Sequence, residues 1–147
     1  MSKKSIVVFS TALIVLLLDQ LTKSLIKQNF QLTQSIPIMK NILHLTYVTN
    51  TGSAFGLFKK LNIFFIFISI VVIIAIYIYL NKIRNNERLL QFAAGLLLGG
   101  TIGNLIDRLI FGHVIDFIDF RIWPVFNVAD SAVTTSIILL IFLLWEK

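Results

Sequence analysis

Four long apolar runs, separated by short polar links and one longer insert, dominate the hydrophobic pattern of this chain. The first extends from Ile6 to Leu18, and its helical pattern continues as far as Ile26. The others cover Leu61 to Leu80, Leu89 to Leu109 and Val125 to Trp145. A helix needs about 20 mainly apolar residues to cross the hydrocarbon core of a bilayer. The pattern therefore predicts four transmembrane helices.

The first run follows Lys3 and Lys4, as the apolar core of a cleavable signal peptide would. No small-residue cleavage site comes after it, and the helical pattern continues through Asp19 and Lys23. We therefore expect an uncleaved first helix.

The insert between the first two helices, residues 28–60, contains a stretch with a period of two. Leu43, Leu45 and Tyr47 alternate there with other residues, as in a half-exposed strand. Asn50–Gly52 then supplies a turn. We expect a small β-sheet on the membrane surface between the first and second helices.

Two further segments are expected at this surface. Phe55, Leu57 and Phe58 should dip towards lipid. The link from Phe111 to Pro124 is too short for a domain and long enough for one surface turn of helix. The predicted fold is thus an all-α integral membrane protein with one small sheet.

Composition supports this interpretation and limits the chemistry. With 57% hydrophobic residues, 14% charged residues and a mean hydropathy of +0.90, the chain is too apolar for an ordinary soluble domain. Its 147 residues suffice for one membrane domain, 1–147. The absence of cysteine excludes disulfides and thiolate chemistry. The net charge of +6 is scattered around the apolar segments, which favours contact with anionic lipid and argues against nucleic acid as a partner.

Charge alone leaves the orientation open. Four spans put both termini on one side, which carries six Lys and Arg residues against seven on the other. The positive-inside rule therefore does not decide which side is cytoplasmic.

The position of the acids is the most informative feature. A carboxylate close to hydrocarbon costs several kcal/mol unless it is paired, hydrated or used, so such acids are functional candidates. Five of the seven acids are aspartates at or near the end of an apolar run: Asp19, Asp107, Asp116, Asp119 and Asp130.

Two patterns indicate helix packing. Gly95, Gly99 and Gly103 recur every four residues, and such a stripe lets helix backbones approach closely. Asp19 and Lys23 are four residues apart with the acid first, a spacing that favours an ion pair. We expect this pair to brace the end of the first helix and the surface sheet.

Polar residues also repeat at helical spacing on the last two helices. Asn104, Asp107 and Arg108 project from one helix face, where Asp107 and Arg108 can form a polar cap at the interface. Asn127 and Asp130 stand three residues apart at the predicted start of the fourth helix. A helix N-terminus favours negative charge, so an N-terminal cap is the simplest interpretation.

A cap does not explain why Asp116 should reach the same membrane depth as Asp107 and Asn104. Two carboxyl groups within a few ångströms share a proton and titrate as a pair. One carboxylate can then take a proton from water while the other donates one to a scissile carbonyl. The acids therefore suggest peptide hydrolysis without a metal.

Other chemistry has weaker support. His44 and His113 are the only histidines and stand in separate loops, so we expect no metal and no cofactor. Ser53 and Ser131 lack a nucleophile motif, and we expect both to form hydrogen bonds only. Two other classes stay open: an ion-conducting or transport oligomer, in which acids would be spread in depth, and a scaffold for lipid-anchored partners.

Five stretches, in this order, resemble the lipoprotein signal peptidase family of bacteria, also called signal peptidase II. They are Asp19–Lys23, Asn50–Gly56, Gly99–Arg108, Val114–Phe117 and Phe126–Ser131. The resemblance extends over nearly the whole chain.

The resemblance implies an aspartyl endopeptidase of the bacterial cytoplasmic (inner) membrane, with both termini cytoplasmic, an extracytoplasmic sheet and an active site near the outer leaflet. Its substrates would be diacylglyceryl-modified prolipoproteins, cut just before the lipidated cysteine. Such a substrate must enter sideways from the bilayer, and the loops around Phe55 and Trp123 are expected to close over it. We expect a monomer.

The resemblance also implies roles for individual residues. Asp116 and Asp130 would be the catalytic dyad. The other positions would order the site, bind substrate backbone, or hold the first helix and the sheet around it: Asp19, Lys23, Asn50, Gly52, Asn104, Asp107, Arg108 and Asn127.

Overall fold

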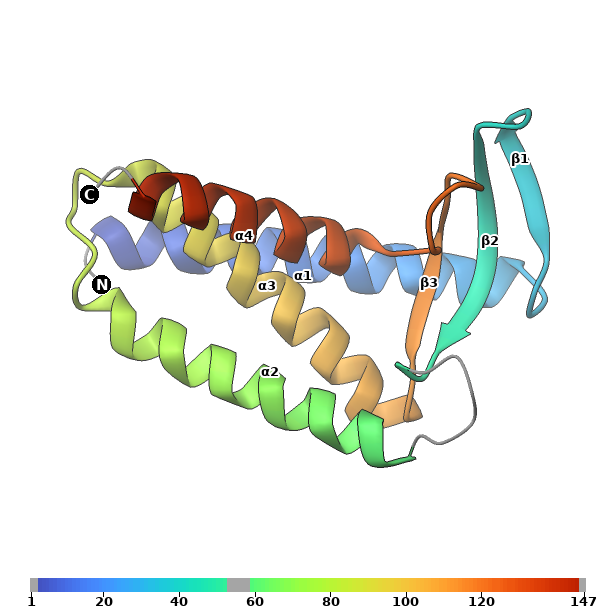
Figure 1. Ribbon diagram of the computed structural model, residues 1–147, viewed down its shortest axis with the longest axis horizontal. Helices are drawn as coiled ribbons and strands as arrows, with labels where there is room; N and C mark the ends of the chain where they lie inside the picture. Colours follow the sequence, from blue (N-terminus) through green and yellow to red (C-terminus); the bar gives the residue numbers. More distant parts are fainter. Residues whose placement is uncertain (1–2, 53–58, 146–147) are drawn as a thin grey trace.

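Four helices and a small sheet make up the described part of the chain, residues 3–52 and 59–145 of the computed structural model (Figure 1). All four helices are long and apolar enough to span a membrane, which confirms the prediction. They are α1 (Lys3–Asn29), α2 (Lys59–Leu80), α3 (Arg88–Phe111) and α4 (Val128–Trp145). Both termini lie at one end of the bundle and the sheet lies at the other (Figure 1).

Helix α3 is the centre of the bundle and packs against α1, α2 and α4. In its most apolar window 61% of the residues are buried, against 17–22% in the other three helices. The polar residues of α3 are thereby shielded from the bilayer, and the outer faces of α1, α2 and α4 are left for lipid.

The glycines of α3 allow this close packing, as predicted. A Cβ atom at Gly99 would lie 2.5 Å from the carbonyl oxygen of Ala12 on α1. One at Gly100 would lie 2.6 Å from the carbonyl oxygen of Ala129 on α4. Gly103 makes room for a side chain instead, because a Cβ atom there would lie 2.5 Å from Oδ2 of Asp19.

The sheet has three antiparallel strands in the order β1-β2-β3. Strands β1 (Ser35–Met39) and β2 (Leu43–Asn50) follow α1, so the predicted strand is confirmed. Strand β3 (Val114–Asp119) comes from the link between α3 and α4 and pairs with β2. The segment containing Phe55, Leu57 and Phe58 lies outside the described residues.

The helical turn expected in the link from Phe111 to Pro124 is therefore wrong. Ile115 and Phe117 are buried and pack with Ile26 of α1 in one apolar cluster. A single exposed turn would leave these side chains in water. As a strand, the segment satisfies its backbone groups on β2 and covers the end of α1.

The other edge of β3 is paired with the residues just before α4. The carbonyl oxygen of Phe126 accepts from the backbone N–H groups of Phe117 and Ile118, and its own N–H donates to Ile118. Helix α4 consequently begins at Val128, three residues after Val125, the start predicted from hydropathy. This pairing brings the start of α4 alongside β3.

Candidate active site

Asn127 joins the two predicted catalytic acids. It is fully buried, and its side-chain Nδ2 donates to Oδ1 of Asp116 at 2.6 Å. Its backbone N–H donates to Oδ2 of Asp130 at 3.3 Å. Its Oδ1 accepts from the backbone N–H of Asp130 at 2.8 Å, which confirms the predicted helix cap. One asparagine thus holds one oxygen of each acid.

The remaining oxygen of each acid also accepts from an asparagine. Asn50 on β2 donates to Oδ2 of Asp116 at 2.9 Å, and Asn104 on α3 donates to Oδ1 of Asp130 at 2.7 Å. Because a carboxylate oxygen has two lone pairs, each of the four oxygens keeps one for water or substrate. Within residues 3–52 and 59–145, no ion pair includes Asp116 or Asp130.

The two acids occupy different environments. Asp116 on β3 is 1% exposed. Burial, and then the negative charge of Asp130, raise the pKa of Asp116 to about 6, against the lowering effect of the hydrogen bonds from Asn50 and Asn127. Asp130 is partly exposed and stands in the first turn of α4, where the helix dipole stabilises a negative charge. Asp116 is therefore the better holder of a proton.

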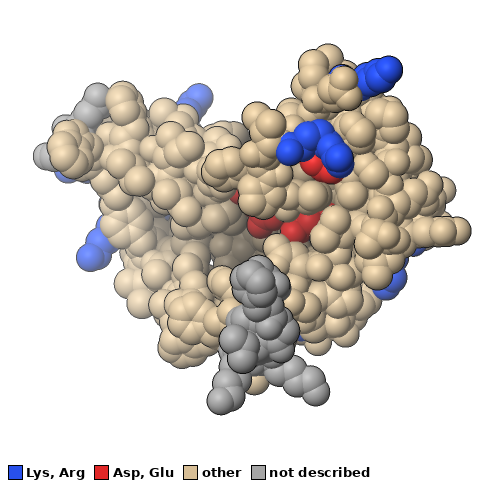
Figure 2. Space-filling view, turned by 45° about the vertical axis from the view of Figure 1, so that its right-hand side comes forward, with Lys and Arg blue, Asp and Glu red and all other residues tan. Residues whose placement is uncertain are grey.

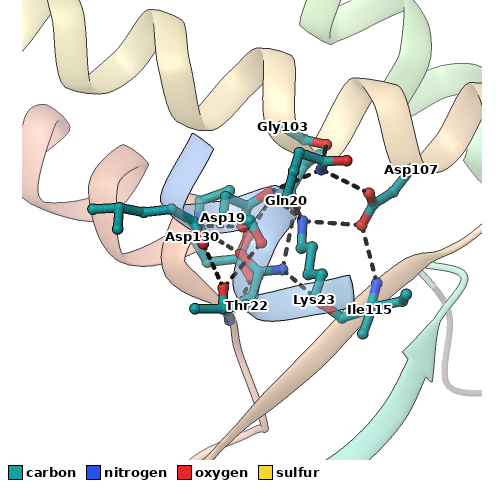
Figure 3. Close-up of polar contacts among 12 residues, drawn as sticks. Asp19, Gln20, Thr22, Lys23, Gly103, Asp107, Ile115 and Asp130 are labelled. Atoms are coloured by element: carbon teal, nitrogen blue, oxygen red, sulfur yellow. Dashed lines mark hydrogen bonds and ion pairs between the residues drawn. The ribbon is translucent and has the colours of Figure 1, made fainter. Parts of the chain in front are cut away.

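Lys23 ties the site to α1. Its Nζ lies 2.7 Å from Oδ2 of Asp19, 2.9 Å from Oδ2 of Asp107 and 2.9 Å from Oδ1 of Asn104 (Figure 3). Lys23 is 2% exposed, Asp19 is 0% and Asp107 is 1%. The predicted ion pair between Asp19 and Lys23 is confirmed, and one buried cation serves two carboxylates.

These two acids bind other elements with their remaining atoms. Oδ1 of Asp19 accepts from the backbone N–H of Ala129 at 2.9 Å, which fixes the start of α4. Oδ2 of Asp107 accepts from the backbone N–H of Ile115 at 3.2 Å, which fixes β3. Asp107 is thus not the self-contained cap of α3 that we expected, and the pair on α1 braces α3 and α4 as well as the sheet.

Gln20 belongs to this network and was not identified from the sequence. Its Nε2 donates to Oδ2 of Asp19 at 3.2 Å, to Oδ1 of Asp107 at 3.0 Å and to the carbonyl oxygen of Gly103 at 3.2 Å (Figure 3). A lone glutamine in an apolar helix carries no periodic signal. The only clue was its place beside Asp19 in a stretch that resembles the family.

Gly52 and Arg108 lie at the edge of the site. Gly52 has a φ of +82°, and its N–H donates to Oδ1 of Asn50 at 2.8 Å, which orients the amide on Asp116. A side chain at Gly52 would also run into the ring of Phe65. The guanidinium of Arg108 stacks on that ring, 4.9 Å from its centroid.

Asp119 lies outside the hydrogen-bond network of the other four aspartates. It accepts from Oγ1 of Thr46 at 2.8 Å and from the backbone N–H and Nη1 of Arg121 at 2.8 and 3.1 Å. Burial opposes its ionisation, but the hydrogen bonds from Thr46 and Arg121 and the charge of Arg121 outweigh burial and lower the pKa of Asp119. Its role is to hold the turn after β3.

The histidines and serines are placed as structural residues. Nδ1 of His44 lies 3.1 Å from the hydroxyl of Ser35, and His113 lies between α3 and β3. Ser131 donates to the carbonyl oxygen of Asn127 at 3.0 Å, as its predicted hydrogen-bonding role requires. Ser53 lies outside the described residues. The described residues form no cluster of three metal-ligating side chains.

A cavity of about 480 Å³ opens beside Asp130. Its lining includes Asn50, the segment from Trp123 to Phe126, and residues further along α4. Figure 2 shows acidic side chains exposed in a hollow of the molecular surface, with basic side chains above them. Asp130, which is partly exposed and lines the cavity, is therefore accessible from outside the bundle, whereas Asp116 is buried behind it.

Known proteins resemble this chain over most of its length. The model of the family described as "Signal peptidase (SPase) II" matches residues 11–146. A lipoprotein signal peptidase of Halothermothrix orenii is 48% identical over 140 residues, covering 95% of this chain and 96% of that protein. Another, of Moorella thermoacetica, is 46% identical and covers 88% and 86%.

Solved structures show the same fold. A bacterial membrane enzyme determined by the in meso method at 2.3 Å resolution superposes with a TM-score of 0.84 and 35% identity, covering 92% of this chain and 85% of that one. A second, determined at 1.9 Å, gives a TM-score of 0.84 and 36% identity, with 91% and 89% covered.

Proposed function

Since the chain belongs to the signal peptidase II family, we propose that it is a membrane-embedded aspartyl endopeptidase with Asp116 and Asp130 as its catalytic dyad. The family makes it a protease that removes signal peptides from prolipoproteins, and a multi-pass protein of the bacterial inner membrane. This membership favours hydrolysis over the transport and scaffold hypotheses. The observation that carries the proposal is the bridge by Asn127 between the two carboxylates.

In this mechanism the dyad shares one proton. Asp116 holds it, because that carboxyl is the more buried, and Asp130 is ionised. A water molecule attacks the scissile carbonyl carbon while Asp130 takes a proton from that water. Asp116 gives its proton to the carbonyl oxygen, so that a neutral diol forms.

Collapse of the diol completes the reaction. The carbon–nitrogen bond breaks, Asp130 returns its proton to the leaving amine, and Asp116 recovers one from a diol hydroxyl. Both acids end in their starting states. The asparagines hold all four carboxyl oxygens throughout, so that little reorganisation is needed during the reaction.

The other predicted site residues have supporting roles in this proposal. Asn127 and Asn104 orient the acids directly, and Asn50 does so from the turn that Gly52 shapes. Lys23, Asp19 and Asp107 hold α1, α3, α4 and β3 in register around them. Arg108 faces the site as a cation and is available to bind substrate backbone.

We place the dyad near the outer leaflet and both termini in the cytoplasm. The termini lie at the end of the bundle opposite the sheet (Figure 1), and a substrate exported through the membrane presents its cleavage site on the outer side. The substrates are diacylglyceryl-modified prolipoproteins, cut just before the lipidated cysteine, and the protein acts as a monomer within membrane lipid. The loop around Trp123 borders the cavity and can cover bound substrate, whereas Phe55 lies outside the described residues.

Single substitutions Asp116→Asn and Asp130→Asn test the dyad. Both keep the side-chain shape but cannot hold the shared proton. We expect each to reduce cleavage of a diacylglyceryl-modified prolipoprotein by at least about 10³-fold, in the range found when a catalytic group is removed. Asp119→Asn is the matched control, since Asp119 lies outside the network of the dyad. Parental activity in either dyad variant, with folding and insertion intact, would exclude the mechanism.

A further inference from the structure

The cavity beside Asp130 continues along α4 and is lined there by two hydroxyl groups that have no hydrogen-bond partner among the described residues. Thr134 and Thr135 line it and are exposed at the surface of the helix. Neither side chain forms a hydrogen bond with any residue in the described part of the chain. Threonine in a transmembrane helix can bond to the carbonyl one turn earlier, as Thr22 does to Leu18 at 2.7 Å. Thr134 and Thr135 differ from that arrangement.

Their surroundings are those of a lipid-facing site. Beyond the two threonines the exposed residues of α4 are apolar, including Ile137, Ile138 and Ile141. The opposite wall is the segment from Trp123 to Phe126. The cavity is thus polar next to Asp130 and at the two hydroxyls, and opens onto a hydrocarbon surface. An occupant should carry polar oxygens close to the scissile bond and acyl chains beyond them.

We propose that Thr134 and Thr135 bind the ester carbonyl oxygens of the substrate's diacylglyceryl group. This inference rests on the proposed function and assigns the lipid of the substrate to one wall of the site. The hydroxyls donate to the carbonyls, and the acyl chains run on along α4 into the bilayer.

The distances along the helix fit this occupant. Thr134 is four residues from Asp130, a rise of about 6 Å at 1.5 Å per residue. The glycerol is linked to the cysteine next to the scissile bond through a flexible thioether, which can cover such a span. A purely apolar segment of signal peptide would instead leave both hydroxyls without partners in a low-dielectric environment, which is unfavourable.

Ester and ether lipids distinguish the proposal from a general effect of the substitutions. The proteins are Thr134→Val, Thr135→Val and the double variant, in which valine keeps the shape and removes the hydroxyl. The substrates are two prolipoprotein peptides, one with a diacylglyceryl cysteine and one with the dialkylglyceryl cysteine that lacks carbonyl oxygens. Each of the two peptides is also tested as a competitive inhibitor of the cleavage of one labelled ester substrate. The affinity for the ether peptide is then obtained without any need for that peptide to be cleaved.

We expect the valine variants to raise KM for the ester about fivefold for each hydrogen bond lost, the change that corresponds to about 1 kcal/mol, with kcat unchanged. Binding of the ether should not change, and the preference of the parent protein for ester over ether should disappear in the double variant. Thr135→Ser, which restores a hydroxyl, should restore the ester KM. Thr22→Val is the control, since Thr22 bonds only within α1.

Equal losses for ester and ether, or no loss for either, would overturn the proposal. The variant Asp130→Asn is measured in the same assays, so that failure of the proposed lipid site can be distinguished from failure of the proposed dyad. Persistent cleavage in Asp130→Asn would refute the proposed mechanism and leave the ester-to-ether comparison readable. Loss of cleavage in Asp130→Asn together with equal ester and ether effects would refute only the lipid site.

Discussion

Replacement of Lys23 by methionine should reveal how strongly the buried ion network holds the bundle. Methionine fills most of the space of the lysine stem but leaves Asp19 and Asp107, which are 0% and 1% exposed, without their cation. Removing one partner of a buried ion pair typically costs about 3–5 kcal/mol, because an uncompensated charge stays behind. Gln20 keeps one hydrogen bond to each acid and does not replace the charge.

We therefore expect Lys23→Met to lower the free energy of unfolding by about 3–5 kcal/mol, a large share of the roughly 5–15 kcal/mol typical of folded proteins. Unfolding in detergent micelles, followed by circular dichroism or by denaturant titration, measures the loss. Lys27→Met is the matched control. Lys27 is exposed one turn further along α1 and its Nζ lies over the ring of Phe111, 4.0 Å from the centroid. Its loss should cost less than about 1 kcal/mol.

A combined variant tests the cause of the loss. Lys23→Met together with Asp19→Asn and Asp107→Asn removes the two stranded charges, so it should be more stable than Lys23→Met alone. Equal losses for Lys23→Met and Lys27→Met would refute the reasoning. So would a combined variant that is less stable than the single one, since its stability would then not depend on unpaired charge.

Four further outcomes follow from the site and the packing. The negative charge of Asp130 contributes to the raised pKa of Asp116, so this pKa should be about 6 in the parent protein and lower in Asp130→Asn. Infrared spectroscopy of the carboxyl band measures it. An unchanged pKa in Asp130→Asn would contradict the coupling of the two acids. The pKa of the folded state exceeds the ordinary 3.8, so ionisation of Asp116 should reduce stability as pH rises from about 4 to about 6, and Asp116→Asn should remove this dependence in unfolding measurements. Gly99→Ala should cost about 1–3 kcal/mol, since the new methyl would overlap the backbone of Ala12, whereas Gly112→Ala, with open space around it, tests the backbone effect alone. Cleavage should persist in EDTA, and inhibition that added zinc reverses would instead indicate a metal site.

The sequence predicted the parts of the fold that depend on local pattern. Apolar length alone identified the four helices, and the spacing of Gly95 and Gly99 identified the close contact of α3 with its neighbours. The pairing of Asp19 with Lys23 followed from one turn of helix. In each case the information lies within a few residues along the chain.

The parts that depend on distant contacts were not predictable in this way. Strand β3 lacks a period of two because it is buried on nearly all sides, so Val114–Asp119 did not resemble a half-exposed strand. The role of Gln20 depends on three acceptors on two helices. The bridge by Asn127 depends on the pairing of Phe126 with β3, which moves the start of α4 to Val128.

The described donors to Asp116 and Asp130 are all amides, which stay neutral over the whole pH range in which proteins are folded. The two carboxyl groups can therefore pass through several charge states while the groups that position them keep theirs. Neither acid forms an ion pair among the described residues, and Lys23 is linked to Asp130 through the side chain of Asn104. The orienting hydrogen bonds thus persist from one turnover to the next, whichever of the two acids carries the proton.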